Sequence, residues 1–408
     1  MRGGMTSVRL VHDVIAEVAG REHELVDLCR RLVAADSANP PGDTRQVADV
    51  VAAFLTAEGL APQVAATDPS MPNVIAVIDS EQPGPHVVLN VHLDTMPPGD
   101  HDAWAVPIFE LTESADRLYG LGMGNMKGAV AAMCVAAGIL HRRKPEWTGR
   151  VTFTAVADEC VFGDNGSAWL LDTVPDLATA DGLICGEGPG LMRLAAAEKG
   201  VFWVDLETTG EAGHASRAKH GQTATARMAA LLGAVDDLNT WIATLPADLD
   251  QVPADDDDAR SLAANVGTVA GGTLVSQMAT VVRAEADLRL PPGITIADIE
   301  TALDSAVSAV PGSSWSRRKG WDANWTGLGT PFMSAFQHAV TAVRGQPAVP
   351  AVRLPASDAS RWRARGVPAV CFGPQPTLSA GVDDFALRQD VVDCAAIYAL
   401  AAVTFSKA

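Results

Sequence analysis

Histidine and acidic residues stand at the ends of several short apolar runs, where side chains from different segments can meet. The run over residues 88–91 is followed by His92 and, two residues later, by Asp94. Alternate residues of a strand point to the same face, so these two side chains share a face. Glu159 and Glu187 each follow another apolar run. In α/β sheets the reactive groups collect at the ends of strands, and imidazole and carboxylate groups there can bind a metal ion or accept a proton.

The length of the chain and the pattern of its apolar residues predict two domains, of which the first contains these groups. At 408 residues the chain exceeds one ordinary core. A content of 48% hydrophobic and 19% charged residues indicates a packed globular protein. Short apolar runs alternate with helical stretches in the first part, which predicts an α/β sheet. The runs cover residues 74–78, 87–91 and 151–156, and the helical stretches cover 128–141 and 165–172.

From about residue 199 the pattern changes to a β-α-β-β-α-β order, which predicts a ferredoxin-like insert. We therefore expect a discontinuous α/β domain over 1–198 and 326–408, and an inserted domain over 199–325. The expected elements of the insert are strands at 201–209, 262–270, 279–290 and 313–325 and helices at 222–240 and 296–310.

Charge and cysteine usage exclude several partners. A formal net charge of −19 argues against binding of nucleic acid or of an anionic membrane surface. No apolar run reaches the roughly 20 residues that span a bilayer, and the first residues lack the apolar core of a signal peptide. Six cysteines without paired spacing predict reduced thiols and a cytoplasmic location.

Four segments stand in a characteristic order and spacing: Val88 to Thr95, Gly120 to Gly128, Ala157 to Cys160 and Cys185 to Glu187. In that order and spacing they resemble the M20 family of zinc amidohydrolases. This family includes aminoacylases, acetylornithine and succinyl-diaminopimelate deacylases, and glutamate carboxypeptidases. The resemblance covers nearly the whole chain. It implies a zinc-peptidase-like domain, with a mixed sheet flanked by helices, and an inserted lid that also forms a homodimer.

The resemblance assigns a metal site and a base. It implies that His92 and Glu187 bind a first zinc ion, that Asp94 orients the imidazole, and that Glu159 is the catalytic general base. The simpler alternative for His92 is a histidine whose hydrogen bonds are made within the strand end. The simpler alternative for Glu187 is a glutamate that caps a loop.

Three ligand positions of the family carry other residues in this chain. Asn125 stands where an aspartate bridges both ions, Cys160 where a carboxylate binds the second ion, and Gly381 where a histidine binds it. We predict that a second zinc ion is absent. His92, Glu187 and the weak donor Asn125 would hold at most one zinc, with the Cys160 thiolate as a further soft ligand. A metal-free pocket is the alternative.

The resemblance also implies substrate contacts. His214 would polarise the substrate carbonyl across the dimer, and Arg289 would hold a substrate carboxylate. Ser276 replaces the asparagine that usually precedes that arginine. Lys127 and Asp358 are further candidates for the pocket. An exposed loop histidine is the alternative for His214, and a structural role is the alternative for Asp358.

Three functions follow from these residues. The first is hydrolysis of the amide bond of a small N-acyl amino acid or dipeptide with at most one metal ion. The second is a metal-independent reaction, in which Glu159 abstracts a proton in an isomerisation, elimination or cyclisation, or Cys160 accepts an acyl group. A nucleophilic Cys160 would need a nearby cation such as Lys127 or His92. The third is a non-catalytic protein that binds a ligand in the same pocket.

Overall fold

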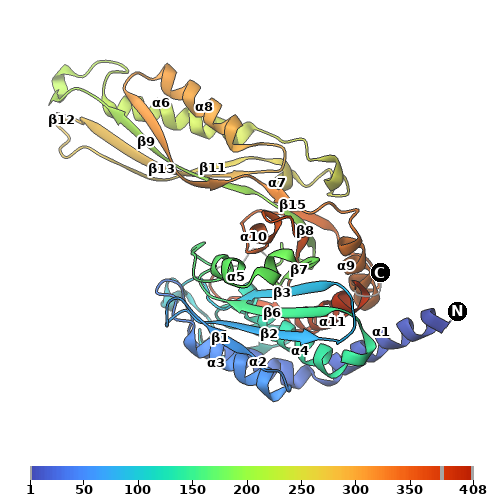
Figure 1. The fold of residues 1–408 in the computed structure, drawn as a ribbon. Coiled ribbons are helices and arrows are strands. Elements are labelled where there is room, and N and C mark those ends of the chain that lie inside the picture. The colour runs from blue at the N-terminus through green and yellow to red at the C-terminus, as the bar shows by residue number, and fades with distance from the viewer. Residues whose placement is uncertain (1, 377–380, 406–408) are drawn as a thin grey trace. The chain divides into compact units, whose positions relative to one another are not determined.

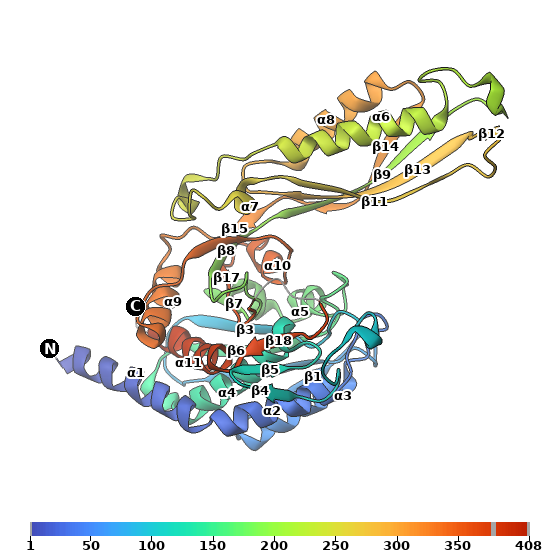
Figure 2. The ribbon, with the colours of Figure 1, turned by 180° about the vertical axis from the view of Figure 1, so that it is seen from behind.

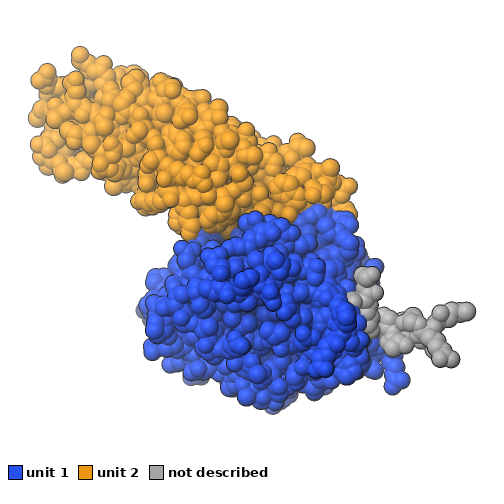
Figure 3. All heavy atoms as spheres, viewed as in Figure 1, with its two compact units in different colours: residues 1–196, 326–351, 357–408 blue, residues 197–325, 352–356 orange. Residues whose placement is uncertain are grey.

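The computed structural model describes residues 2–376 and 381–405, which form two compact units (Figure 3). The first unit comprises residues 1–196, 326–351 and 357–408, and the second comprises 197–325 and 352–356. The short segment 352–356 belongs to the second unit, a detail that the sequence does not predict.

A mixed nine-stranded sheet forms the centre of the first unit (Figure 1). The strand β3 runs parallel to β6 and β7, and β7 runs parallel to β17, whereas the pairs β1–β2, β2–β6 and β8–β17 are antiparallel. The strand order is β1 (Gln63–Ala65), β2 (Asn73–Asp79), β6 (Arg150–Val156), β3 (His86–His92), β7 (Gly182–Cys185), β17 (Ala369–Cys371), β8 (Leu194–Glu198) and β15 (Asn324–Trp325), with β16 (Pro350–Arg353) beside β8.

Helices cover both faces of this sheet, as Figures 1 and 2 show from opposite sides. One face carries α1 (Arg2–Gly20), α2 (Glu22–Ala34), α3 (Arg45–Ala57), α4 (Gly128–Arg142) and α11 (Arg388–Phe405); α9 (Pro331–Arg344) packs against α11. The other face carries α5 (Ser167–Thr173) and α10 (Ala359–Arg363). The predicted fold class, a mixed α/β sheet flanked by helices, is confirmed.

Helix α4 is the central helix of the first unit. All its residues from Gly128 to Leu140 are buried, because alanine, valine, methionine and leucine occupy every side of the helix. It packs against α2, α3 and α11 and against β3. The stretch Met123–Arg142 has the length and apolar character of a membrane span, but 94% of its most apolar window is buried inside the fold, as in the core helix of a globular unit.

A small antiparallel sheet flanks the glycine-rich turn that precedes α4. Its strand order is β18 (Phe385–Leu387), β5 (Arg117–Tyr119) and β4 (Thr112–Ser114).

The second unit is a four-stranded antiparallel sheet with two helices. Its strand order is β11 (Ala263–Gly271), β13 (Val281–Leu290), β9 (Gly200–Thr209) and β14 (Ser313–Trp321), and its helices are α6 (Ala224–Asp236) and α8 (Ile296–Ala309). The chain order is the predicted β-α-β-β-α-β. A short helix α7 (Asp257–Arg260) and a two-stranded antiparallel sheet of β10 (Gly213–His214) and β12 (Gln277–Met278) complete it. A role as lid or dimer surface stays a prediction.

Candidate active site

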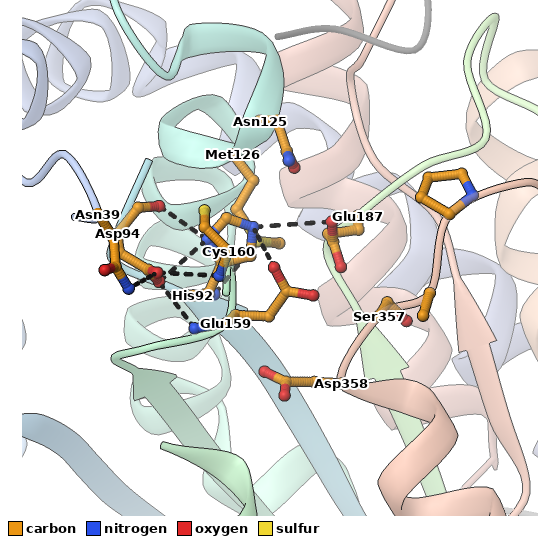
Figure 4. A network of polar contacts seen from close by, with 12 residues as sticks. Asn39, His92, Asp94, Asn125, Met126, Glu159, Cys160, Glu187, Ser357 and Asp358 are labelled. Atoms are coloured by element: carbon orange, nitrogen blue, oxygen red, sulfur yellow. Dashed lines mark hydrogen bonds and ion pairs between the residues drawn. The ribbon is translucent and has the colours of Figure 1, made fainter. Parts of the chain in front are cut away.

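The parallel strands β3, β6 and β7 deliver the predicted site residues to one edge of the sheet. His92 is the last residue of β3 and pairs with Val156 of β6. Glu159 lies in the loop after β6, and Glu187 lies just after β7. Strands that run in the same direction end at the same edge, so the loops after them meet there. Figure 4 shows the carboxylates of Glu159 and Glu187 beside the His92 ring.

The ring of His92 is fixed in one orientation. Its Nδ1–H donates to the backbone carbonyl oxygen of Asp94 at 2.8 Å. Its Nε2 is buried and has no hydrogen-bond partner among the described residues; the nearest carboxylate oxygens belong to Glu187, at 3.7 Å, and Glu159, at 3.8 Å. A fixed imidazole nitrogen that faces two carboxylates is the donor arrangement of a cation site.

Asp94 acts differently from the prediction. Its carboxylate lies 3.6 Å from His92 Nδ1, while its backbone carbonyl makes the hydrogen bond. The carboxylate instead accepts hydrogen bonds from the backbone N–H groups of Cys160 (2.9 Å) and Glu159 (3.2 Å). The carboxylate is held away from the ring because two adjacent backbone N–H groups of the loop after β6 face its two oxygens. Asp94 therefore fixes the loop that carries the predicted base.

Asn39 belongs to this network, although its sequence context does not predict it. Its Nδ2 donates to Asp94 Oδ2 at 2.9 Å and to Asp158 Oδ1 at 3.3 Å. Asn39 is buried in the turn between α2 and α3. An asparagine beside two prolines is the only signal in the sequence, and a turn explains such a residue equally well.

The pocket holds more negative than positive charge. Burial, followed by the charge of Glu187, holds the pKa of Glu159 well above its usual value. Burial also raises the pKa of Asp358 to about 6. Burial favours a neutral His92 ring, but Glu187 and Glu159 outweigh it and hold the pKa of His92 well above its usual value. A bound cation would offset these carboxylates, so His92 and Glu187 fit one metal ion.

Cys160 lies near enough to take part in such a site. One ligand atom from each of His92, Glu159 and Cys160 can be chosen so that all three lie within 4.8 Å of one another. Burial and the surrounding carboxylates, first that of Asp94, raise the pKa of the Cys160 thiol. These surroundings oppose a free thiolate nucleophile, because a reactive cysteine needs a cation beside it.

Asn125 does not offer its oxygen freely as the predicted weak ligand. Its Oδ1 accepts a hydrogen bond of 2.8 Å from Nε2 of Gln375. Gln375 is buried after β17 and is not among the predicted site residues. The hydrogen bond arises because the loop after β17 returns to the glycine-rich turn, a tertiary contact without a sequence signal.

Lys127 is not placed as predicted. Its side chain is 1% exposed, and its Nζ donates to the backbone carbonyl of Ala35 at 2.9 Å. Burial lowers its pKa to about 8, and Asp36 and Asp384 are the charges that act on it. The structure therefore gives Lys127 a structural role, since a buried ammonium can compensate its lost hydration only with such local partners.

Asp384 holds the glycine-rich turn. Its two carboxylate oxygens accept hydrogen bonds from the N–H groups of Gly122 (2.9 Å) and Gly124 (3.2 Å). Gly122 has φ +84°, and a Cβ there would lie 2.5 Å from Thr95 Cγ2, so the turn requires glycine at this position.

At the three exchanged positions the described residues offer few ligand atoms for a second ion. Gly381 and Asn125 line one small pocket with Thr95 and Leu121, but glycine has no ligand atom and the oxygen of Asn125 is bound by Gln375. The neighbouring Ser379 and Ala380 lie outside the described residues. The Cys160 sulfur is the remaining donor of that set among the described residues. The absence of a second zinc ion stays a prediction.

Asp358 precedes α10 in the same unit and is buried, and its charge acts on the carboxyl group of Glu159. Its Oδ1 lies 3.7 Å from Arg361 Nε. In Figure 4 its carboxylate faces that of Glu159.

The remaining predicted residues lie in the second unit. His214 is exposed in β10, and its Nδ1 lies 2.9 Å from Ser216 Oγ. The backbone carbonyl of Ser276 accepts from Ala215 N at 2.9 Å, so Ser276 lies beside the His214 turn. Arg289 in β13 makes a two-pronged ion pair with Asp287, with N–O distances of 2.9 to 3.1 Å.

Known proteins are similar to this chain in sequence or in fold. Residues 88–404 match the model of Peptidase family M20/M25/M40. A succinyl-diaminopimelate desuccinylase from Alteromonas mediterranea is 24% identical over 335 residues, which cover 77% of this chain and 82% of that protein. Human carnosine dipeptidase 1 has a similar structure, with a TM-score of 0.75 at 15% identity over 98% of this chain and 99% of that one. An M20 family metallo-carboxypeptidase from Sulfolobus solfataricus gives a TM-score of 0.74 at 15% identity, over 95% and 99% of the two chains.

The family match covers most of the chain, and the chain therefore belongs to Peptidase family M20/M25/M40. This confirms the resemblance predicted from its motifs. The family and the desuccinylase relatives are hydrolytic enzymes that act on amide bonds, and the chain is an enzyme of this class.

Proposed function

We propose that the chain hydrolyses the amide bond of a small N-acyl amino acid or dipeptide-like substrate with at most one metal ion. The observation that carries this proposal is the buried Nε2 of His92, which faces Glu187 and Glu159 without a hydrogen-bond partner among the described residues. The names of the relatives, a desuccinylase and a dipeptidase, support a substrate of this class.

His92 and Glu187 would hold the ion. Cys160 lies near His92 and Glu159, with one ligand atom of each within 4.8 Å of the others, and could add a soft ligand from that side. When bound, a zinc ion lowers the pKa of a coordinated water and polarises a carbonyl. Glu159 then takes the proton of the attacking water and delivers it to the nitrogen of the leaving amine. Burial and the charge of Glu187 raise the pKa of Glu159, which favours its holding the proton between the two transfers.

The substrate contacts proposed for the second unit require two copies of the chain. Arg289 lies eight residues along β13 from Val281, which is about 27 Å in an extended strand. His214 pairs with Gln277, which lies before Val281. A small amide cannot span that distance, so we propose that His214 and Arg289 of one active site come from different protomers of a homodimer. Arg289 would exchange Asp287 for the substrate carboxylate.

The test is a metal analysis joined to an activity screen. The purified protein is assayed on N-acetyl and N-succinyl amino acids and on dipeptides, before and after chelation, with zinc counted by mass spectrometry. We expect about one zinc per chain and loss of activity on chelation. Glu159→Gln should keep its zinc and lose about 10²- to 10⁴-fold in kcat. Undiminished activity in protein without metal would refute the proposal.

A metal-independent reaction is the second candidate, and the raised pKa of Glu159 favours its proton-abstraction form. Acyl transfer by Cys160 is the weaker form, because carboxylates surround the thiol and Lys127 is bound to Ala35. A cytoplasmic location is proposed because the six cysteines have no paired spacing in the sequence.

A further inference from the structure

Asn125 stands where the family resemblance implies a bridging carboxylate, and a second side-chain amide, that of Gln375, binds it. The Nε2 of Gln375 donates to Asn125 Oδ1 at 2.8 Å. Gln375 is 2% exposed, and its own Oε1 has no hydrogen-bond partner among the described residues. Asn125 also lines a small pocket with Thr95, Leu121 and Gly381.

The hydrogen bond with Gln375 determines which group of the Asn125 side chain is turned to the pocket. An asparagine side chain has one carbonyl oxygen and an amino group with two donors. Because Gln375 occupies one of the two lone pairs of the oxygen, the amino group with its two donors is the larger part that remains for a ligand. The reverse pairing, with Asn125 as the donor to Gln375, would leave both buried N–H groups of Gln375 to be satisfied, and orphaned buried donors are rarer than under-satisfied carbonyls.

We propose that the Asn125 amino group donates a hydrogen bond to the carbonyl oxygen of the scissile amide, in the place of a second metal ion, and that Gln375 is the positioning residue that holds it. This inference rests on the proposed amide hydrolysis and deepens it. A neutral donor fixed before the reaction stabilises the negative charge that develops on that oxygen. It would supplement the contact proposed for His214 and would explain how a pocket without a second ion polarises its substrate.

The decisive variant is Asn125→Asp, which restores the family's carboxylate. If Asn125 is a degenerate metal ligand, this change should raise activity or zinc content. If Asn125 is a donor, the change removes the donor and adds a charge that repels the developing oxyanion. We expect kcat to fall about 10²- to 10³-fold, with KM little changed and the zinc content of the chain unaltered.

Gln375→Glu tests the positioning role. An ionised glutamate only accepts hydrogen bonds, so it should turn the amino group of Asn125 toward itself and away from the substrate. We expect a similar loss of kcat, whereas Gln82→Glu, the same chemical change on an exposed residue, should leave kcat within about twofold, as surface changes usually do. Equal activity of Gln375→Glu and wild type would overturn the assignment.

A spectroscopic reading separates this inference from the hydrolysis proposal. In a Glu159→Gln background, which slows turnover, the infrared C=O stretch of bound ¹³C-labelled N-acetyl-L-alanine is compared with and without Asn125→Asp. We expect a lower frequency in the protein that keeps Asn125, because only the amide can donate to the carbonyl oxygen. A downshift without any hydrolysis by the wild type would refute the proposed function alone. An equal frequency in both proteins, or a second zinc bound by N125D, would refute the donor role.

Discussion

At the scale of single residues, two polar atoms of the site differ in whether they have a hydrogen-bond partner. His92 Nε2 has carboxylates nearby but no hydrogen bond among the described residues, while the oxygen of Asn125 is taken by Gln375. The first arrangement suits a cation, and the second suits a donor to the substrate. The two positions therefore differ in chemistry although both belong to one site (Figure 4).

Asn39 offers the clearest residue-scale prediction. Asn39→Ala removes the two hydrogen bonds that the side chain donates to Asp94 and Asp158. We expect the free energy of unfolding to fall by about 2 kcal/mol. Asn39→Asp should cost more, because it adds a third buried carboxylate to two. Urea denaturation of the three proteins measures this order. A less stable Asn39→Ala than Asn39→Asp would contradict it.

At the scale of elements, the glycine-rich turn is tied to the C-terminal part of the chain by one carboxylate. Asp384 accepts from Gly122 and Gly124, and the same turn carries Asn125. Burial raises the pKa of Asp384 to about 7 from an ordinary value of 3.8.

The raised pKa of Asp384 predicts that the stability of the protein falls as the pH rises. The folded state binds the proton more tightly than the unfolded state, so the contribution of Asp384 is fully present below about pH 4 and is lost as the pH rises through about 7. Asp384→Asn lacks this titration. The wild type should therefore lose stability relative to Asp384→Asn by roughly 1.4 kcal/mol per pH unit in that window. Urea denaturation at several pH values tests it, and a difference that is flat or rises with pH would be the contrary result.

Elements with a regular pattern can be predicted from the sequence, and contacts between loops cannot. The apolar residues of α4 and the runs that form β2, β3 and β6 carry their own periodicity. Strand ends and motif spacing likewise mark His92, Glu159 and Glu187.

Two further residues of the site, Asn39 and Gln375, have no signal in the neighbouring sequence. Asn39 and Gln375 escape prediction because their partners are far away in the chain. The two-stranded sheet of β10 and β12 is not predicted, because two-residue strands have no measurable alternation of apolar and polar residues.

At the scale of the whole molecule, the separation of His214 and Arg289 leads to a prediction about assembly. Glu159→Gln and His214→Ala should each be nearly inactive alone. If His214 acts across a homodimer, mixed dimers of the two variants contain one site with an intact Glu159 and an intact His214 from the partner. Dissociating and reassembling the variants together should restore part of the activity, and light scattering should show a dimer. No recovery from a confirmed mixed dimer would argue that His214 acts within its own protomer.

The number of metal ions is the most direct test of the site as a whole. Crystals of the unmodified protein saturated with zinc would be measured by anomalous diffraction. We predict no more than one peak in the pocket, next to His92 Nε2 and Glu187, and none between Asn125, Cys160 and Gly381. Two fully occupied peaks about 3.5–4 Å apart would show that the exchanged residues still hold a metal pair, and would contradict the single-ion site.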